Sequence, residues 1–240
     1  FICPPTSTLL QEELGIPNCA EYTIHSNCTA PYKGLQLASE LLGSGRYKTA
    51  LVVSSNLVSN ALKGPYFNPE KLERNAAMLR FFLSDGAGAM VLGAGARGVG
   101  PGTYIVNTFL ESVGAGSPSH MYSRAGASTA GPKQDYEDGL HHIVQDFSSV
   151  STIGPELFSQ GFDRMIEQIR SKKGQDHFEA RAKDVSHCLI NVPRRHLIDL
   201  VADEMNKKFM PHLGGKLPDD LYFTTIDKLG YTGPAAMPIT

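Results

Sequence analysis

The order of predicted elements in the first quarter of the chain constrains its fold more than any other feature. Residues 21–26 alternate in polarity and are rich in β-forming residues, so they predict a strand. A helical pattern begins at Pro31 and ends at residues 43–45, and the apolar run 49–53 predicts a strand buried on both faces, as in a parallel sheet. Strand, helix and strand in this order form a βαβ unit and favour an α/β fold.

The rest of the sequence continues this alternation. A short helix with a Ser or Thr cap is predicted after Pro5, and residues 114–138, which lack apolar periodicity, predict a long loop. The glycine-rich joint 93–102 predicts a boundary between an N-terminal half, residues 1–98, and a C-terminal half, residues 99–240. Further strands are predicted at 90–92, 104–110 and 188–190, and further helices at 154–169 and 195–208.

Composition excludes several classes of partner. The 240 residues carry 22 Lys and Arg against 24 Asp and Glu, a net charge of −2, so nothing favours binding to nucleic acid or to an anionic membrane. No apolar run of roughly eighteen residues predicts a membrane span. Four cysteines without a CxxC pair predict neither a disulfide framework nor a metal site, and favour a reducing, cytoplasmic setting. Because the chain begins at Phe1 rather than Met, we expect it to be a piece of a longer protein.

Two other motifs are interpreted as carrying no function. Residues 93–98 match the GxGxxG pattern, but a strand rather than a helix is predicted after them, so no dinucleotide site is expected. His141 and His142 lie beside acidic residues without a partner at metal-ligand spacing, so they are predicted to be surface histidines.

Cys28 lies on the predicted turn between the first strand and the helix that follows. A side chain there projects over the end of the sheet, in a geometry that resembles the nucleophile elbow. The helix N-terminus carries positive partial charge and favours the thiolate, which is the nucleophilic form of cysteine. From position alone, Cys28 is either a nucleophile or a small buried hydrophobic residue.

Two segments carry a family resemblance. Residues 25–35 (HSNCTAPYKGL), continued by residues 41–53, resemble the active-site segment of β-ketoacyl-acyl-carrier-protein synthase III, and residues 82–93 (FLSDGAGAMVLG) are similar to its DGAGA strand. The resemblance implies a thiolase-like α/β fold, with two similar halves stacked as αβαβα layers in a dimer. It also implies strands ahead of Phe1 and a closing glycine-rich segment beyond Thr240.

The resemblance implies ping-pong acyl-transfer chemistry without a bound cofactor. Cys28 would take an acyl group from coenzyme A or from an acyl carrier protein, and its backbone N–H would supply half of the oxyanion hole. In the family, a malonyl-carrier protein is then decarboxylated and condensed onto the acyl group. The implied partners are acyl carrier protein or coenzyme A thioesters, and a second copy or a homologue in the dimer.

Two positions depart from the family pattern. The family's histidine, which follows an apolar strand, is matched by Asn191, and its asparagine, in a Gly-Asn-Thr turn, is matched by Tyr231. An amide at residue 191 can donate a hydrogen bond but cannot carry a proton as a general base. The histidines near the matched segments are interpreted as structural: His25, His187 and His196.

Three functional hypotheses remain open. The chain is an acyltransferase that passes the acyl group from Cys28 to a carbon, oxygen or nitrogen acceptor. Alternatively it is a decarboxylative condensing enzyme of the 3-oxoacyl-ACP synthase type, or a catalytically impaired partner subunit of an active homologue. Simple acyl transfer needs the nucleophile and the oxyanion hole but no enolate stabilisation, so it tolerates the departures at Asn191 and Tyr231 better than condensation does.

Overall fold

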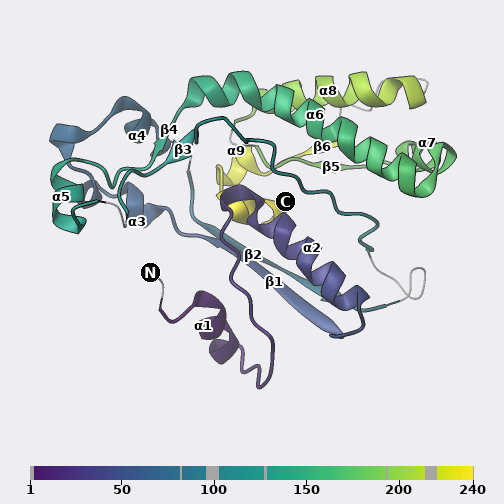
Figure 1. Cartoon of the computed structure of the whole chain (residues 1–240), viewed down its shortest axis with the longest axis horizontal. Helices are drawn as coiled ribbons and strands as arrows, with labels where there is room; N and C mark the ends of the chain where they lie inside the picture. Colours follow the sequence, from purple (N-terminus) through teal and green to yellow (C-terminus); the bar gives the residue numbers. More distant parts are fainter. Residues whose placement is uncertain are drawn as a thin grey trace.

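The computed structural model of the chain describes residues 3–81, 83–95, 103–126, 129–192, 194–213 and 221–239, as a mixture of helices and strands (Figure 1). The α-helices are α1 (Thr6–Glu13), α2 (Ala30–Gly43), α3 (Ser59–Leu62), α4 (Arg74–Leu79), α5 (Pro132–Glu137), α6 (Phe147–Lys173), α7 (Gln175–Lys183), α8 (His196–Leu213), α9 (Ile226–Leu229) and α10 (Ala236–Ile239). The strands are β1 (Thr49–Asn56), β2 (Gly86–Gly93), β3 (Met121–Tyr122), β4 (Val144–Gln145), β5 (Cys188–Leu189) and β6 (Tyr222–Phe223).

The longest strand pair joins β1 and β2, which run antiparallel and pair over their whole length. Helix α2 packs against this pair and leaves the opposite face with exposed apolar side chains: Leu51, Val53 and Val91 are 41%, 37% and 75% exposed. Successive strand side chains point to opposite faces, so only alternate residues of β1 are covered. The prediction of a parallel strand buried on both faces is therefore wrong.

The strands predicted at 21–26 and 104–110 are also wrong, since the structure has no regular element at either segment. A strand exists through hydrogen bonds to a neighbouring strand, and no described segment pairs with these residues. The expected βαβ unit therefore lacks its first strand, and only its helix α2 and its second strand β1 are present. Helices α1 and α2 confirm the two helix predictions, but the residue before α1 is Pro5, with no side-chain cap.

The C-terminal part of the chain gathers its long helices α6, α7 and α8 on one side of the molecule (Figure 1). Their shared core is Ile166, Phe178, Ala182, Met205 and Leu221, each at most 5% exposed. Helix α6 contains the predicted 154–169 segment but begins earlier, because Asp146 caps it by accepting a hydrogen bond from the Ser149 N–H at 3.0 Å.

His142, one of the adjacent histidines 141 and 142, is buried between the segments that precede α4 and β4. His142 is 2% exposed, and its Nε2 accepts a hydrogen bond from the backbone N–H of Asn68 at 3.1 Å. The prediction of a surface histidine is therefore wrong for His142, which joins the segment before α4 to the segment before β4. The predicted loop 114–138 likewise contains two regular elements, β3 and α5.

The C-terminal end of the chain packs beside α2 and β2. In Figure 1 the yellow terminal segment lies beside the start of α2, and α10 packs on β2. A Cβ at Gly88 would lie 2.8 Å from Pro238, so the two elements meet without room for a side chain. The predicted boundary between residues 98 and 99 lies outside the described residues. Within the described part, no helix is long and apolar enough to cross a membrane.

Candidate active site

Cys28 lies in a tight turn directly before α2. It is the middle residue of a short 3-10 helix, Asn27–Thr29, and α2 begins at Ala30. Asn27 has a φ of 45°, a left-handed conformation that asparagine tolerates better than most residues. The Thr29 hydroxyl donates to the Ser26 carbonyl at 2.8 Å and closes the turn. The half-buried Cys28 side chain is thereby held at the N-terminal end of a helix, where a developing negative charge is favoured.

Tyr231 brings its hydroxyl to the cysteine. Its Oη donates a hydrogen bond to Cys28 Sγ at 2.7 Å, across 203 residues of sequence. Tyr231 is 7% exposed, and burial together with the neighbouring Cys28 raises the pKa of its phenol well above the ordinary value. The phenol is therefore neutral near pH 7 and acts as a hydrogen-bond donor to the sulfur.

The backbone around Tyr231 is fixed by the segment that leads into β2. The Ser84 N–H donates to the Tyr231 carbonyl at 2.9 Å, and Leu83 forms an isolated parallel bridge with Tyr231. Two residues later, Gly233 has a φ of 58°, and a Cβ there would lie 2.8 Å from the side chain of Asn56. The turn that presents Tyr231 therefore requires glycine at residue 233.

Asn191 follows β5 and reaches the same turn. Its Nδ2 donates to the Gly233 carbonyl at 3.3 Å, whereas its Oδ1 is buried without a hydrogen-bond partner. The structure thus brings all three residues predicted for the site, Cys28, Asn191 and Tyr231, to one cluster around residues 231–233.

Tyr32 is a further member of this cluster, which the sequence did not predict. Burial raises the pKa of its phenol, a hydrogen bond from the Asn191 side chain opposes that rise, and the nearby Cys28 adds to it. Tyr32 follows Cys28 by four residues at the start of a helix. Side chains at this spacing lie on one helix face, and that signal would have identified Tyr32.

The cluster contains phenols and an amide rather than an imidazole. His25, His187 and His196 are all exposed, and among the described residues no histidine is recorded in contact with Cys28. The site donates a hydrogen bond to the Cys28 sulfur, but its described groups include no imidazole that could act as a general base there.

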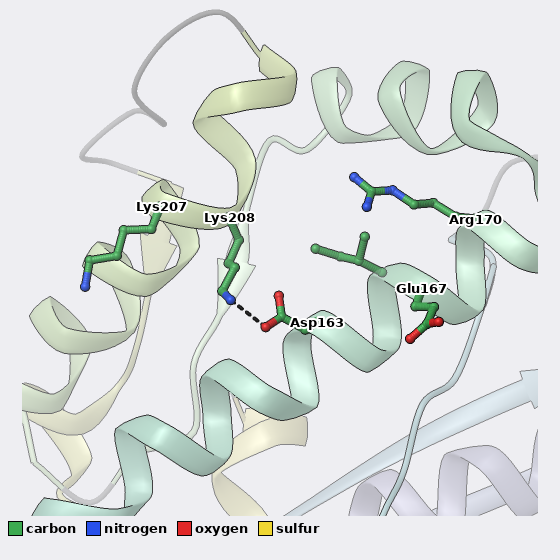
Figure 2. A pocket seen from close by; sticks show the side chains of 6 residues that line it. Asp163, Glu167, Arg170, Lys207 and Lys208 are labelled. Carbon is green, nitrogen blue, oxygen red and sulfur yellow. Dashed lines mark hydrogen bonds and ion pairs between the residues drawn. The ribbon is translucent and has the colours of Figure 1, made fainter.

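A separate cavity of about 490 Å³ lies between α6 and α8, lined by Asp163, Glu167, Arg170, Lys207 and Lys208 over the buried Ile166 (Figure 2). Lys208 pairs with Asp163 across the two helices, and Lys207 pairs with Glu204 on its own helix. Because these charges are already paired, the cavity offers no free cation cluster. No group of His, Cys, Asp or Glu among the described residues could hold a metal ion.

Known proteins resemble the segment that carries Cys28. Residues 22–114 match the family of 3-oxoacyl-[acyl-carrier-protein (ACP)] synthase III. The β-ketoacyl-[acyl-carrier-protein] synthase III of Syntrophomonas wolfei is 30% identical over 169 residues, 70% of this chain and 46% of that protein. Acetoacetyl CoA synthase NphT7 of Streptomyces sp. (strain CL190) is 29% identical over 239 residues, 99% of this chain and 62% of that protein. The chain therefore spans less than two thirds of the length of either relative.

Solved structures share the fold of the whole chain. The synthase III of Pseudomonas aeruginosa PAO1 superimposes with a TM-score of 0.70 at 21% identity, covering 100% of this chain and 63% of that one. AbyA1, a tetronic acid condensing enzyme, does so with a TM-score of 0.66 at 19% identity, covering 100% of this chain and 64% of that one. The expected thiolase-like α/β fold is confirmed. Residues 22–114 therefore resemble β-ketoacyl-[acyl-carrier-protein] synthase III, and the chain has the fold of these synthases.

Proposed function

We propose that the protein is an acyltransferase of the β-ketoacyl-ACP synthase III type. It takes an acyl group from acyl-CoA or acyl-ACP onto Cys28 and passes it to an acceptor in fatty-acid or polyketide-type biosynthesis. The observation that carries the proposal is the 2.7 Å hydrogen bond from Tyr231 Oη to Cys28 Sγ, formed at the N-terminal end of α2. A helix terminus and a neutral phenol both stabilise negative charge on that sulfur.

The first half-reaction follows from this arrangement. The Cys28 sulfur attacks the thioester carbonyl, a new C–S bond forms, and the bond to the donor thiol breaks. The proton that Cys28 gives up leaves with the donor thiol, so the phenol of Tyr231 ends the step unchanged. The oxyanion of the tetrahedral intermediate needs donors, and the backbone N–H of Cys28 is proposed as one of them.

Two other functions remain as candidates. Decarboxylative condensation is favoured by the similar proteins, which include an acetoacetyl CoA synthase and a tetronic acid condensing enzyme. A catalytically impaired partner subunit is favoured by Asn191, an amide at the position where the family that the chain resembles has a histidine. Simple acyl transfer stands first because Cys28 has its hydrogen-bond donor in place while no described imidazole reaches it.

The partners follow from the same proposal. The substrates are acyl carrier protein or coenzyme A thioesters, and the family resemblance supports a homodimer or a heterodimer with a homologue. The cytoplasm, where these thioesters are made, is the proposed setting. The N-terminal half, residues 1–98, supplies Cys28 and Tyr32, and the C-terminal half, residues 99–240, supplies Asn191 and Tyr231.

Peptide mapping tests the proposal. The purified chain is incubated with acyl-CoA or with acyl-ACP, digested, and searched by mass spectrometry for an acyl group on the Cys28 peptide. We expect the adduct in the unaltered chain and in Cys19→Ser, which alters an exposed cysteine, and its loss in Cys28→Ser. Absence of an adduct with every donor would reject both catalytic functions and leave the partner-subunit function.

A further inference from the structure

The side chain of Asn191 uses a donor and leaves its acceptor unpaired. Its Nδ2 donates to the Gly233 carbonyl at 3.3 Å. Its Oδ1 is buried without a hydrogen-bond partner.

The orientation of this amide is fixed by chemistry. A carbonyl oxygen can only accept a hydrogen bond, so the Asn191 atom that faces the Gly233 carbonyl must be the nitrogen. Turning the amide over would place two oxygens against each other. The unpaired buried atom is therefore a hydrogen-bond acceptor, and leaving it unpaired is costly.

An unpaired acceptor selects the kind of group that can enter the site. A malonyl thioester and the enolate left by its decarboxylation present oxygens, which need donors and are repelled by Oδ1 of Asn191. The Tyr231 proton is already directed at Cys28 Sγ. A group that carries its own N–H or O–H would instead pair with Oδ1.

We propose that the acyl acceptor is a primary amine, which donates one N–H to Asn191 Oδ1 while its nitrogen attacks the acyl group on Cys28. This inference rests on the acyltransferase function proposed above. An amine is preferred to an alcohol because Asn191 cannot carry a proton: one hydrogen stays bonded to Oδ1 and a second must be transferred. An alcohol has only one hydrogen for both tasks.

The transfer step balances without a general base. The amine nitrogen forms a C–N bond with the acyl carbon, and the C–S bond to Cys28 breaks. The second amine proton passes to the Tyr231 hydroxyl as that hydroxyl gives its own proton to the departing sulfur. The products are an amide and a free thiol, and Tyr231 returns to the neutral phenol that its raised pKa favours.

Three small probes of matched size test the acceptor class on the full chain. The acyl-enzyme is formed first, excess donor is removed, and its decay is followed by intact mass with glycinamide (a primary amine), sarcosinamide (a secondary amine) or glycolamide (an alcohol). A fourth sample receives malonyl-CoA. Each rate is divided by the rate at which the same probe reacts with acyl-CoA without protein, which removes differences in intrinsic nucleophilicity.

After this correction, glycinamide should discharge the acyl-enzyme about tenfold faster than sarcosinamide or glycolamide. In Asn191→Leu this advantage of glycinamide should disappear, a fall of about tenfold, since the variant lacks the acceptor that the amine N–H would pair with. In the same variant, the rate at which glycinamide discharges the acyl-enzyme should fall relative to the rate at which Cys28 is acylated. The thermal midpoint of the variant shows whether the chain is folded.

Other outcomes overturn the inference. Equal corrected rates for the three probes, or discharge by malonyl-CoA with release of carbon dioxide while glycinamide has no effect, would reject the amine acceptor. If the acyl-enzyme forms normally, either result leaves the proposed function intact. If no acyl-enzyme forms with any donor, the acyltransferase function fails first and the amine acceptor with it.

Discussion

The residues around Cys28 form a site that contains two neutral phenols. Tyr231 donates to the sulfur at 2.7 Å, and Tyr32 lies one helical turn from the cysteine. Burial raises the pKa of both phenols, so neither ionises near pH 7. A donor that stays neutral stabilises charge on sulfur without competing for the proton, and this is what acylation of Cys28 needs.

Removing the Tyr231 hydroxyl should slow acylation. Tyr231→Phe keeps the ring and deletes only the donor, so we expect the rate of acyl transfer onto Cys28 to fall about ten- to hundredfold. Stopped-flow release of coenzyme A measures this rate. Tyr136→Phe, which deletes a phenol in the α5 region, is the matched control and should leave the rate unchanged. An unaltered rate in Tyr231→Phe would show that the hydrogen bond has no catalytic role.

The raised phenol pKa values also predict a dependence of stability on pH. In the unfolded chain Tyr231 and Tyr32 ionise near pH 10, whereas the folded chain keeps their protons, so the unfolded state binds fewer protons above that pH. The contribution of these two phenols to the free energy of unfolding should therefore be constant below about pH 10. It should make the free energy of unfolding fall as the pH rises further.

Urea titrations at pH 8 and above measure this decline. In Tyr231→Phe the decline should be shallower, since one of the two groups no longer titrates. An equally steep decline in the variant would mean that Tyr231 is not shielded from ionisation in the folded chain.

At this scale the sequence predicted Cys28 from its place before a helix, and it predicted Asn191 and Tyr231 from the family resemblance. It did not predict Tyr32, because the predicted helix begins at Pro31, so Cys28 was placed before the helix and the four-residue spacing was not applied to it. Nor could it predict that Tyr231 donates to the sulfur, since that contact joins residues 203 positions apart.

At the scale of elements, helices were predicted better than strands. Helix α2 is defined by local periodicity and by Pro31 in its first turn, both visible in the sequence. A strand depends on a partner elsewhere in the chain, so the alternation in residues 21–26 was not enough to make one. The same dependence explains β1: its apolar run was visible, but its antiparallel pairing with β2 was not.

The buried His142 predicts how the segments it joins respond to substitution. His142→Leu removes the acceptor of the Asn68 N–H and leaves that group unpaired, which should cost roughly 1–3 kcal/mol of folding free energy. Chemical denaturation checks the value, with His187→Leu, an exposed histidine, as the control. Equal stability of the two variants would contradict the structural role of His142.

His142 also predicts an acid dependence. Burial, and then the neighbouring charge of His141, lowers the pKa of His142. The unfolded chain therefore binds a proton near pH 6.5 that the folded chain binds only at lower pH, so stability should fall as the pH drops below about 6.5. Thermal midpoints between pH 5 and 7.5 measure this loss. His142→Leu should show a smaller loss than the unaltered chain, and an equal loss would assign the effect to other groups.

In the molecule as a whole, the C-terminal segment is joined to the β1–β2 pair by direct contacts. Gly88 of β2 meets Pro238 of α10, and the Ser54 hydroxyl donates to the Pro234 carbonyl at 2.9 Å. These contacts lie behind the turn that carries Tyr231, so they position the phenol over Cys28. The composition and the local patterns of the sequence contain no sign of this closure, which explains why the site could be predicted only as separate residues.

A larger side chain at residue 88, where Gly88 contacts Pro238, should therefore lower both the stability of the chain and the rate of acylation. A side chain in Gly88→Val has no space against Pro238, so we expect roughly 1–3 kcal/mol of destabilisation and slower acylation of Cys28. Gly93→Val, in the same strand with nothing within 4 Å of the added Cβ, is the matched control and should change neither quantity appreciably. Equal effects of the two substitutions would show that β2 and α10 do not meet as described.

If Cys28 accepts an acyl group, mixing the full chain with acyl-CoA releases a burst of coenzyme A. We expect about one coenzyme A per chain in the first turnover, before any acceptor is added. We expect no burst from Cys28→Ala and a slower burst of the same size from Tyr231→Phe. A burst that persists undiminished in Cys28→Ala would show that Cys28 is not the acylated residue.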